Sequence, residues 1–300
     1  MLAFNPEPGE ASRLETRVRR ILAPNPSPMT FRGTNTYLIG DTDLAVVDPG
    51  PDSASHLQAI LSAVYSGQSI THICVTHAHL DHSGLAKALS METGAPIIAY
   101  GGPSSGRSSV MQQLASSGLA GGGEGVDKNF CPDMQVSDGD VIRGPDWTLD
   151  VFHTPGHFGN HIAFGFEDMC FVGDHVMGWA SSLVSPPDGD LTDFMTSCEK
   201  LRARRWRVFH AGHGAPIENP AERLDWLIAH RKSREVEILS ALESGPATAE
   251  ALAVLIYKHT PAELLPAATR NVFAHLVDLK GKRQVSSIGD LRAEAIFELQ

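Results

Sequence analysis

The sequence is poor in cysteine. Its 300 residues include only four, at positions 74, 131, 170 and 198, and no two of them form a C-x-x-C pair. A zinc ribbon or a disulfide-dense secreted scaffold needs closely spaced cysteines, so both classes are excluded. We therefore expect reduced, buried thiols and a cytoplasmic location.

Long apolar runs and an excess of positive charge are missing as well. No apolar segment reaches the roughly 18 residues that a membrane helix needs, so we expect no membrane association. The chain has 24 Lys and Arg against 35 Asp and Glu, which gives a formal net charge of −11. This charge disfavours generic binding to nucleic acid or to anionic membranes. A hydrophobic content of 42% still allows a large core and excludes global disorder.

The order of the secondary-structure patterns indicates two parts. Strand and helix patterns alternate up to about residue 220, and helical patterns dominate after it. We predict a catalytic domain over residues 1–230 and a smaller domain over residues 231–300. Residues 101–125 hold eight Gly and six Ser, which indicates a flexible insertion with a short helix around residues 110–119. Such an insertion could act as a lid over a small pocket.

Histidine is the residue that the sequence has in unusual number, with 14 copies. The densest group is His77-Ala-His79-Leu-Asp81-His82, directly after the β-rich segment 70–76. Neutral imidazole binds borderline metals such as zinc at neutral pH. Three His and one Asp at one strand-to-helix turn can point at a single spot, so this group predicts a metal site.

Three further loops carry one potential ligand each, just after a strand pattern. These ligands are His157, Asp174 and His213, and each has a neighbouring glycine that lets the backbone turn sharply. The whole set suits two zinc ions, although another first-row divalent metal could replace them. Three His could hold one ion, two His and Asp81 could hold the other, and Asp174 could bridge both. The predicted ligands are His77, His79, Asp81, His82, His157, Asp174 and His213.

These motifs resemble those of the metallo-β-lactamase superfamily, which implies an α/β fold built as an αββα sandwich. Residues 25–40 (NPSPMTFRGTNTYLIG) resemble the N-terminal signature of the branch that carries a C-terminal winged-helix domain. Leu255-Ile-Tyr257 and Asn271-Val-Phe-Ala-His275-Leu resemble the tail of that branch. The branch includes an animal mitochondrial endoribonuclease and fungal enzymes that release polyketides by thioester cleavage.

The resemblance also implies how the ligands are shared and what residues 231–300 form. It implies His77, His79 and His157 on the first zinc, and Asp81, His82 and His213 on the second, with Asp174 between them. It implies a winged helix for the C-terminal domain. His210 stands where a Tyr is expected before the Gly-His-Gly motif, a departure that concerns the substrate and not the metal site.

The expected chemistry is hydrolysis. Two zinc ions would lower the pKa of a bridging water to about 7, and the resulting hydroxide would attack a carbonyl carbon or a phosphorus atom. Asp81 could act as a catalytic residue that orients this nucleophile or accepts its proton. The acid that protonates the leaving group stays open, with His153, His175 and His210 as the candidates nearest in sequence. These three and His161 could instead support the ligands through hydrogen bonds.

Three functions follow from this chemistry and from the resemblance. The first, which we favour, is hydrolysis of a small anionic substrate that carries a carboxylic ester, thioester or lactone. The second is single-strand RNA cleavage. Residues 231–300 contain 9 Lys and Arg and 9 Asp and Glu, so they have no excess of positive charge with which to bind RNA phosphates. The third, more remote function is DNA-binding regulation through the winged helix. True β-lactamase activity is disfavoured, because a bridging Asp174 is typical of the wider hydrolase group.

Overall fold

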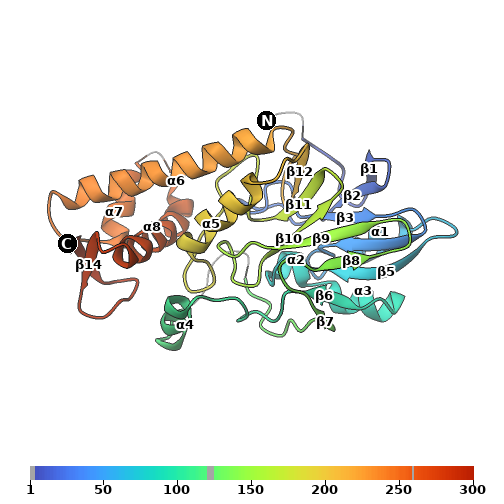
Figure 1. Cartoon of the computed structure of the whole chain (residues 1–300), viewed down its shortest axis with the longest axis horizontal. Coiled ribbons are helices and arrows are strands. Elements are labelled where there is room, and N and C mark those ends of the chain that lie inside the picture. Colours follow the sequence, from blue (N-terminus) through green and yellow to red (C-terminus); the bar gives the residue numbers. More distant parts are fainter. Residues whose placement is uncertain (1–3, 120–124, 259) are drawn as a thin grey trace.

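The computed structural model describes residues 4–119, 125–258 and 260–300 (Figure 1). Two sheets form the centre of the larger part. In spatial order the first sheet contains β1 (Ala11–Glu15), β2 (Val18–Leu22), β3 (Asn35–Ile39), β4 (Asp43–Val47), β5 (Ser69–Cys74), β6 (Ile97–Ala99) and β7 (Met134–Gln135). The second contains β12 (Val208–Ala211), β11 (Met169–Gly173), β10 (Ile162–Phe166), β9 (Thr148–His153) and β8 (Val141–Arg143).

Strand direction decides where the loops gather. From β4 to β7 the neighbouring strands of the first sheet are parallel. In the second sheet only β11 and β12 are parallel, so the loops that follow these two strands leave at the same end. A parallel pair needs a crossover connection, which here contains α5 (Leu191–Arg202).

Helices cover the outer faces of both sheets, with α1 (Ala54–Ser62), α2 (Leu80–Ser83) and α3 (Ala86–Thr93) following strands of the first sheet. Tyr37 of β3 packs on Phe171 of β11 between the sheets, with ring centroids 5.0 Å apart. The next residue, Leu38, points to the opposite face and joins a cluster with Leu89 of α3. On the far side, Phe194 of α5 packs into a cluster with strands of the second sheet. Successive side chains of a strand point to opposite faces of the sheet. Both faces of these sheets are buried, which explains why their strands are almost continuously apolar. The predicted αββα sandwich is confirmed.

The C-terminal part is a small helical unit with a three-stranded sheet. Its elements are α6 (Pro220–Leu242), β13 (Ala247–Thr248), α7 (Ala249–Ile256), the 3₁₀ helix η1 (Ala262–Leu264), α8 (Leu265–Gly281), β14 (Val285–Ile288) and β15 (Ile296–Leu299). The sheet order is β13-β15-β14. Thr248 caps α7 by accepting a hydrogen bond from the Ala251 amide, as its position before an apolar segment predicts.

Helix α6 joins the two parts without a break (Figure 1). The predicted boundary between residues 230 and 231 falls inside this 23-residue helix. Sequence patterns mark a change of packing partner, but nothing between Pro220 and Leu242 interrupts the helix, and the first glycine after it is Gly245. The division of the chain at this position stays a prediction.

The described part of the glycine-rich insertion contains helix α4 (Ser109–Ser116), which confirms the short helix predicted around residues 110–119. Met111 and Leu114 of α4 belong to the buried cluster of the C-terminal part. Part of the predicted insertion, residues 120–124, lies outside the described residues. Among the helices of the described ranges, none combines the length and the apolar character that a membrane crossing requires.

Candidate metal centre

The structure brings all seven predicted ligands together at one end of the sandwich. His77 and His79 lie in the loop after β5, and Asp81 and His82 belong to the short helix α2 that follows. The remaining three come from the loops after β9, β11 and β12; they are His157, Asp174 and His213. They form three overlapping groups in which the potential ligand atoms lie within 4.8 Å of one another. Loops from both sheets therefore converge on one small volume.

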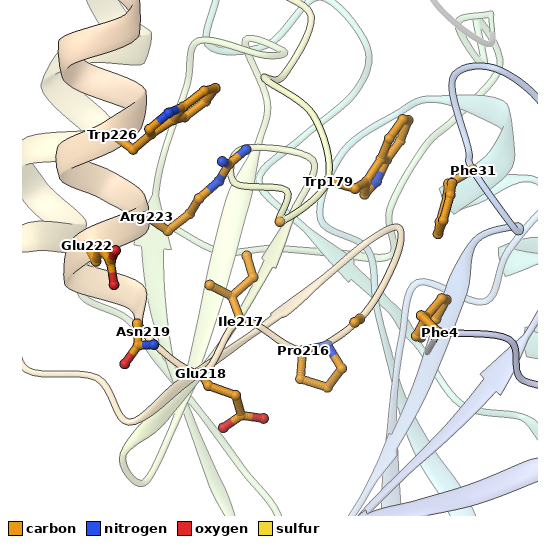
Figure 2. A pocket seen from close by; sticks show the side chains of 12 residues that line it. Phe4, Phe31, Trp179, Pro216, Ile217, Glu218, Asn219, Glu222, Arg223 and Trp226 are labelled. Carbon is orange, nitrogen blue, oxygen red and sulfur yellow. The ribbon is translucent and has the colours of Figure 1, made fainter. Parts of the chain in front are cut away.

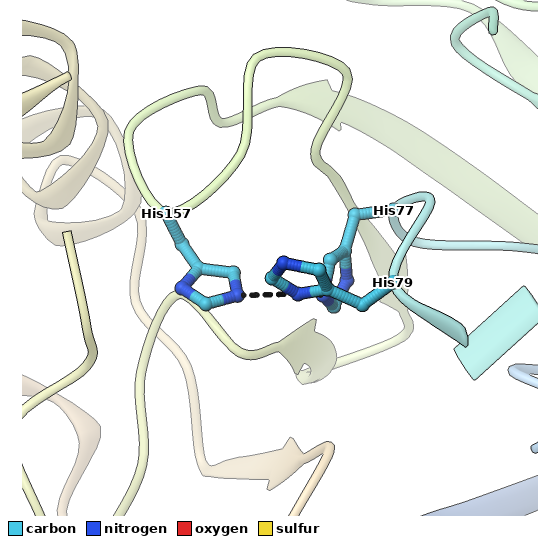
Figure 3. Close-up of side chains that lie close together, drawn as sticks. All are labelled: His77, His79 and His157. Atoms are coloured by element: carbon cyan, nitrogen blue, oxygen red, sulfur yellow. Dashed lines mark hydrogen bonds between the residues drawn. The ribbon is translucent and has the colours of Figure 1, made fainter. Parts of the chain in front are cut away.

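The first group consists of three imidazoles (Figure 3). Nε2 of His77 lies 2.8 Å from Nδ1 of His79, and Nε2 of His157 lies 3.1 Å from the same Nδ1. Figure 3 shows the three rings close together and nearly perpendicular to one another, although His157 comes from a different loop. His79 thus offers its Nδ1 where the other two offer Nε2.

The second group combines carboxylates with imidazoles. Oδ2 of Asp81 lies 3.4 Å from Nε2 of His82 and 3.3 Å from Nε2 of His213. Asp174 lies between the two groups: Oδ1 is 3.4 Å from His82, and Oδ2 is 3.2 Å from His213 and 3.7 Å from His157. A carboxylate in this position can serve both groups, as the sequence predicts for Asp174.

Burial and the nearby carboxylates together give the histidines of the two groups opposite pKa shifts. Burial lowers the pKa of His79 to about 3 and that of His77 well below its usual value, so both rings are neutral. Burial also lowers the pKa of His82 and His213, but the nearby carboxylates outweigh it. The pKa of His82 is raised well above its usual value, by Asp81 first, and that of His213 to about 10, by Asp174 first. The carboxylates thus favour a positive charge on these two imidazoles, as they would favour a bound cation.

The donor set fits divalent metal ions. Nε2 of His82 and Oδ1 of Asp174 are buried and have no hydrogen-bond partner within the described residues. Imidazole nitrogens and carboxylate oxygens, with no thiolate among them, suit zinc and other first-row divalent metals. The cluster can bind metals, and the identity and number of the ions stay a prediction.

Asp48 supports the second group and was missed by the sequence analysis. Its Oδ2 lies 2.8 Å from Nδ1 of His82, which fixes the ring with Nε2 toward the centre. Asp48 in turn accepts hydrogen bonds from the amide and the hydroxyl of Thr76, at 2.7 and 2.8 Å. Such carboxylate–histidine pairs orient metal ligands. The only signal in the sequence is a carboxylate at the end of an apolar strand, before Pro49-Gly50.

Thr34 and Asn25 form a second support that sequence reasoning missed. The Thr34 hydroxyl lies 3.1 Å from Oδ2 of Asp81. Asn25 holds Thr34 from both sides: its Oδ1 accepts from the Thr34 amide and its Nδ2 donates to the Thr34 hydroxyl, both at 2.9 Å. Backbone carbonyls complete the support, because Nδ1 of His213 bonds to Gly33 O at 3.2 Å and Nδ1 of His157 to Leu183 O at 2.7 Å.

The four additional histidines lie at different places. His161 is nearest: its ring centroid is 5.2 Å from that of His77, and its Nδ1 bonds to the Thr154 hydroxyl. The other three have different partners. Nε2 of His175 lies 3.5 Å from Sγ of Cys198, and the His153 ring stacks on Tyr100. The His210 ring packs on Tyr37 and Phe171. Within the described residues, no hydrogen bond or ring contact joins these three to the seven ligands. The role of all four stays a prediction.

Glycine at position 212 is needed for space. A Cβ atom there would lie 2.4 Å from Oδ1 of Asp174 and 2.6 Å from Cε1 of His82. Real Cβ contacts are longer than this, so either ligand would have to move. The first glycine of the Gly-His-Gly motif thus lets Asp174 and His82 lie close to the backbone, in addition to allowing the turn that carries His213.

A cavity of about 480 Å³ is lined in part by residues 215–219, which follow the loop of His213 (Figure 2). Phe31 and Trp179 form one wall, with ring centroids 5.1 Å apart, and Trp226 stands on the opposite side on α6. The Trp179 ring lies against Gly214, which directly follows the predicted ligand His213. The cavity also borders on the carboxylates Glu218 and Glu222. It is therefore an aromatic pocket whose lining contains two carboxylates and the cation Arg223, beside the loop that carries His213.

Comparisons with known proteins agree with this arrangement. Residues 29–213 match the sequence family described as the Metallo-beta-lactamase superfamily, and residues 248–294 match the Beta-lactamase associated winged helix domain. The chain is 30% identical over 299 residues to a beta-lactamase-like protein 2 homolog of Drosophila melanogaster, across 93% of this chain and 94% of that protein.

Two further relatives extend the comparison. The chain is 29% identical over 279 residues to an atrochrysone carboxyl ACP thioesterase of Aspergillus fumigatus, across 86% of this chain and 79% of that protein. A metallo-beta-lactamase family protein of Thermus thermophilus has a similar structure, with a TM-score of 0.77 at 24% identity over 96% of this chain and 100% of that chain. The predicted C-terminal winged helix is confirmed by the family match.

Proposed function

This chain belongs to the hydrolases of the metallo-beta-lactamase superfamily, and we propose that it uses two zinc ions to cleave a carboxylic thioester, ester or lactone. The observation that carries the proposal is the convergence of seven buried His and Asp side chains in three overlapping groups around Asp174. His77, His79 and His157 would hold one ion. Asp81, His82 and His213 would hold the other, with Asp174 between the two.

The residues around the ions divide the remaining work. When bound, two zinc ions acidify a water molecule and polarise the bond to be cleaved. Asp81 would orient the attacking water or accept its proton, and the hydrogen bond from Thr34 holds its carboxylate in place. Asp48 would keep His82 oriented through its Nδ1. Two divalent ions beside two carboxylates leave the site positive, which favours a small substrate with a negative group near the cleaved bond.

The surroundings of the site favour a leaving group that needs no acid. His153, His175 and His210 make no hydrogen bond or ring contact with the seven ligands in the part of the chain that the structure describes. A thiolate leaves without protonation, whereas the alkoxide released from RNA needs a proton donor. A thioester therefore suits the site better than a phosphodiester does.

The aromatic cavity supports the same choice. Phe31 and Trp179 can contact an apolar acyl group beside the loop that follows His213, and burial of apolar area is the main source of affinity for such a group. Glu218 and Glu222 line the cavity together with one cation, Arg223, so the charge of the lining is net negative and disfavours the phosphates of an RNA strand. The name of the Aspergillus fumigatus relative, a thioesterase, points in the same direction.

The packing of α8 argues against a DNA-binding regulator. A winged helix that reads DNA presents one helix to the major groove. In α8 every residue from Val272 to Leu279 is buried, and Ala274 belongs to the same cluster as the core of the second sheet. We propose that the winged helix packs on the catalytic part instead of binding nucleic acid.

A substrate panel with metal analysis tests the proposal. The purified chain should contain about two zinc ions and should hydrolyse acyl thioesters faster than lactones, with no cleavage of single-stranded RNA. His79→Ala should abolish the activity. His72→Ala should keep it, because the His72 ring in β5 packs on Trp147 and bonds to the Thr71 hydroxyl, neither of which is a predicted ligand. Zinc content of one ion or none would contradict the two-ion site. Cleavage of single-stranded RNA without thioester hydrolysis would contradict the proposed substrate and favour the endoribonuclease function instead.

A further inference from the structure

Arg231 is a buried cation without an acidic partner. It lies on α6, is 2% exposed, and forms no ion pair with any carboxylate in residues 4–119, 125–258 and 260–300. Its Nη1 donates to Oδ1 of Asn271 at 3.1 Å, its Nη2 donates to the carbonyl of Ser182, and its guanidinium lies 5.0 Å from the centroid of the Phe194 ring. Burial lowers the pKa of Arg231. Burying a charge without an opposite charge costs folding free energy. We therefore ask what the contacts of Arg231 contribute besides stability.

Asn271 on α8 completes a clamp around one short loop. Its Oδ1 accepts a hydrogen bond from the Val184 amide at 3.0 Å in addition to the one from Arg231. Arg231 holds Ser182 and Asn271 holds Val184, so the two C-terminal helices fix the residues on both sides of Leu183. The clamp consists of Arg231 and Asn271.

Leu183 connects the clamp to the metal centre. Its carbonyl accepts the hydrogen bond from Nδ1 of His157 at 2.7 Å. This bond fixes the tautomer of His157 and points its Nε2 toward His79. A shift of the loop would turn the His157 ring away from the position that it shares with His77 and His79.

We propose that Arg231 and Asn271 are positioning residues for the metal centre, which act on His157 through the carbonyl of Leu183. The C-terminal part is then a component of the metal site. This proposal rests on the proposed function, because it requires His157 to bind an ion. It gives the interface between α6, α8 and the catalytic part a task other than stability.

Zinc affinity distinguishes positioning from a merely structural role. Asn271→Leu removes both accepted hydrogen bonds, and Arg231→Met removes the guanidinium. Both variants should lose one of the two zinc ions to a chelator at a roughly 10–100-fold lower chelator concentration than the wild type does, the usual effect of removing a residue that orients a ligand. Asn271→Asp, which keeps the acceptor oxygen for Val184 and Arg231, should restore most of the affinity.

A control at the same interface separates folding from metal binding. The Thr192 hydroxyl donates to Oδ1 of Asp278 at 2.7 Å and joins α5 to α8 without touching residues 182–184. Thr192→Val should lower the melting temperature but leave both zinc affinities within about twofold of wild type. If Arg231→Met does not fold, Arg231→Lys, which keeps the charge and loses the fork geometry, takes its place.

The outcomes are distinct. Zinc affinities of Asn271→Leu and of the Arg231 variant that match those of the wild type, with a lowered melting temperature like that of Thr192→Val, would overturn the positioning role alone. Absence of tightly bound zinc from the wild-type chain would overturn the proposed function and the positioning role together. Selective loss of one ion in both variants, with recovery in Asn271→Asp, supports the proposal.

Discussion

At the scale of single residues, Asp48 illustrates how a ligand depends on a neighbour that binds no ion itself. Its carboxylate receives one hydrogen bond from His82 and two from Thr76. We expect Asp48→Ala to lower the affinity for one of the two ions by about 10–100-fold, because His82 loses the partner that sets its orientation. Titration of the metal-free chain with zinc in a competing chelator measures this.

Asp150→Asn provides the control for that prediction, because Asp150 is a partly exposed carboxylate that pairs with Arg204 on the surface. Surface ion pairs contribute little, so this variant should bind zinc like the wild type. Equal zinc affinity in Asp48→Ala and wild type would show that the ring of His82 is held by other contacts.

His56 gives a prediction about pH. The ring is buried, its Nε2 lies 2.8 Å from the Thr36 hydroxyl, and burial lowers its pKa to about 4. In the unfolded chain the pKa is about 6.5. As the pH falls from about 6.5 to about 4, the unfolded chain binds a proton that the folded chain does not bind. The folded state therefore loses up to about 3 kcal/mol over this range and keeps this stability above pH 6.5.

His56→Gln isolates this effect, because glutamine does not titrate and can still bond to Thr36. We expect the wild type to be the more stable chain at pH 8, and its advantage over His56→Gln to shrink by about 3 kcal/mol at pH 4. Urea unfolding of both chains in the presence of a chelator measures the difference, in which the contributions of the other histidines cancel. A pH-independent difference would mean that His56 has the same pKa in the folded and unfolded chains.

Residue identity allowed the ligands to be predicted but not their supports. His77, His79 and His82 stand out because imidazoles cluster at one turn, and a glycine marks the loop of His213. Thr34 and Asp48 are single polar residues beside strands, a pattern that occurs throughout globular proteins without a site. Their role depends on contacts between segments about 30 to 50 residues apart in the chain, and one sequence shows no such contacts.

At the scale of elements, α4 shows the same limit. The glycine-rich composition of residues 101–125 predicted a flexible insertion, with a short helix around residues 110–119. The spacing of Met111 and Leu114 reveals an apolar face, but it does not reveal that the partner of this face is the core of the C-terminal part. Strands such as β3 were easier to predict. Successive side chains of a strand point to opposite faces, so a short continuous apolar segment already indicates a strand that is buried on both faces.

Leu114 tests whether α4 is docked on the C-terminal part. It is 2% exposed and shares a buried cluster with Leu276 and Phe297. Leu114→Ala should destabilise the chain by about 2 kcal/mol, at the lower end for a buried leucine because a short helix can move to fill the space. Urea unfolding measures this, with Met91→Ala as the control, since Met91 is 78% exposed. A change as small as that of Met91→Ala would mean that α4 is not docked in solution.

At the scale of the whole molecule, side-chain contacts join the two parts in addition to the continuous helix α6. Ala274 of α8 belongs to the cluster that contains the core of the second sheet, and Thr192 of α5 bonds to Asp278 of α8. The clamp of Arg231 and Asn271 adds a third connection between the parts. The net charge of −11 lies entirely in residues 1–230, whereas residues 231–300 are neutral, so no charge repulsion opposes this packing.

These connections predict that the zinc-loaded chain unfolds in a single thermal transition. The four tryptophans at positions 147, 179, 206 and 226 all lie in the predicted catalytic domain, so their fluorescence follows that part alone, while calorimetry follows the whole chain. The two midpoints should coincide, and the calorimetric and van't Hoff enthalpies should agree, because neither part can lose α6 or the α5–α8 contacts without the other. Two calorimetric transitions, of which fluorescence follows only one, would instead show that the parts unfold independently. The boundary inside α6 would then separate two cooperative units, and the packing of α8 would add little to the stability of the catalytic part.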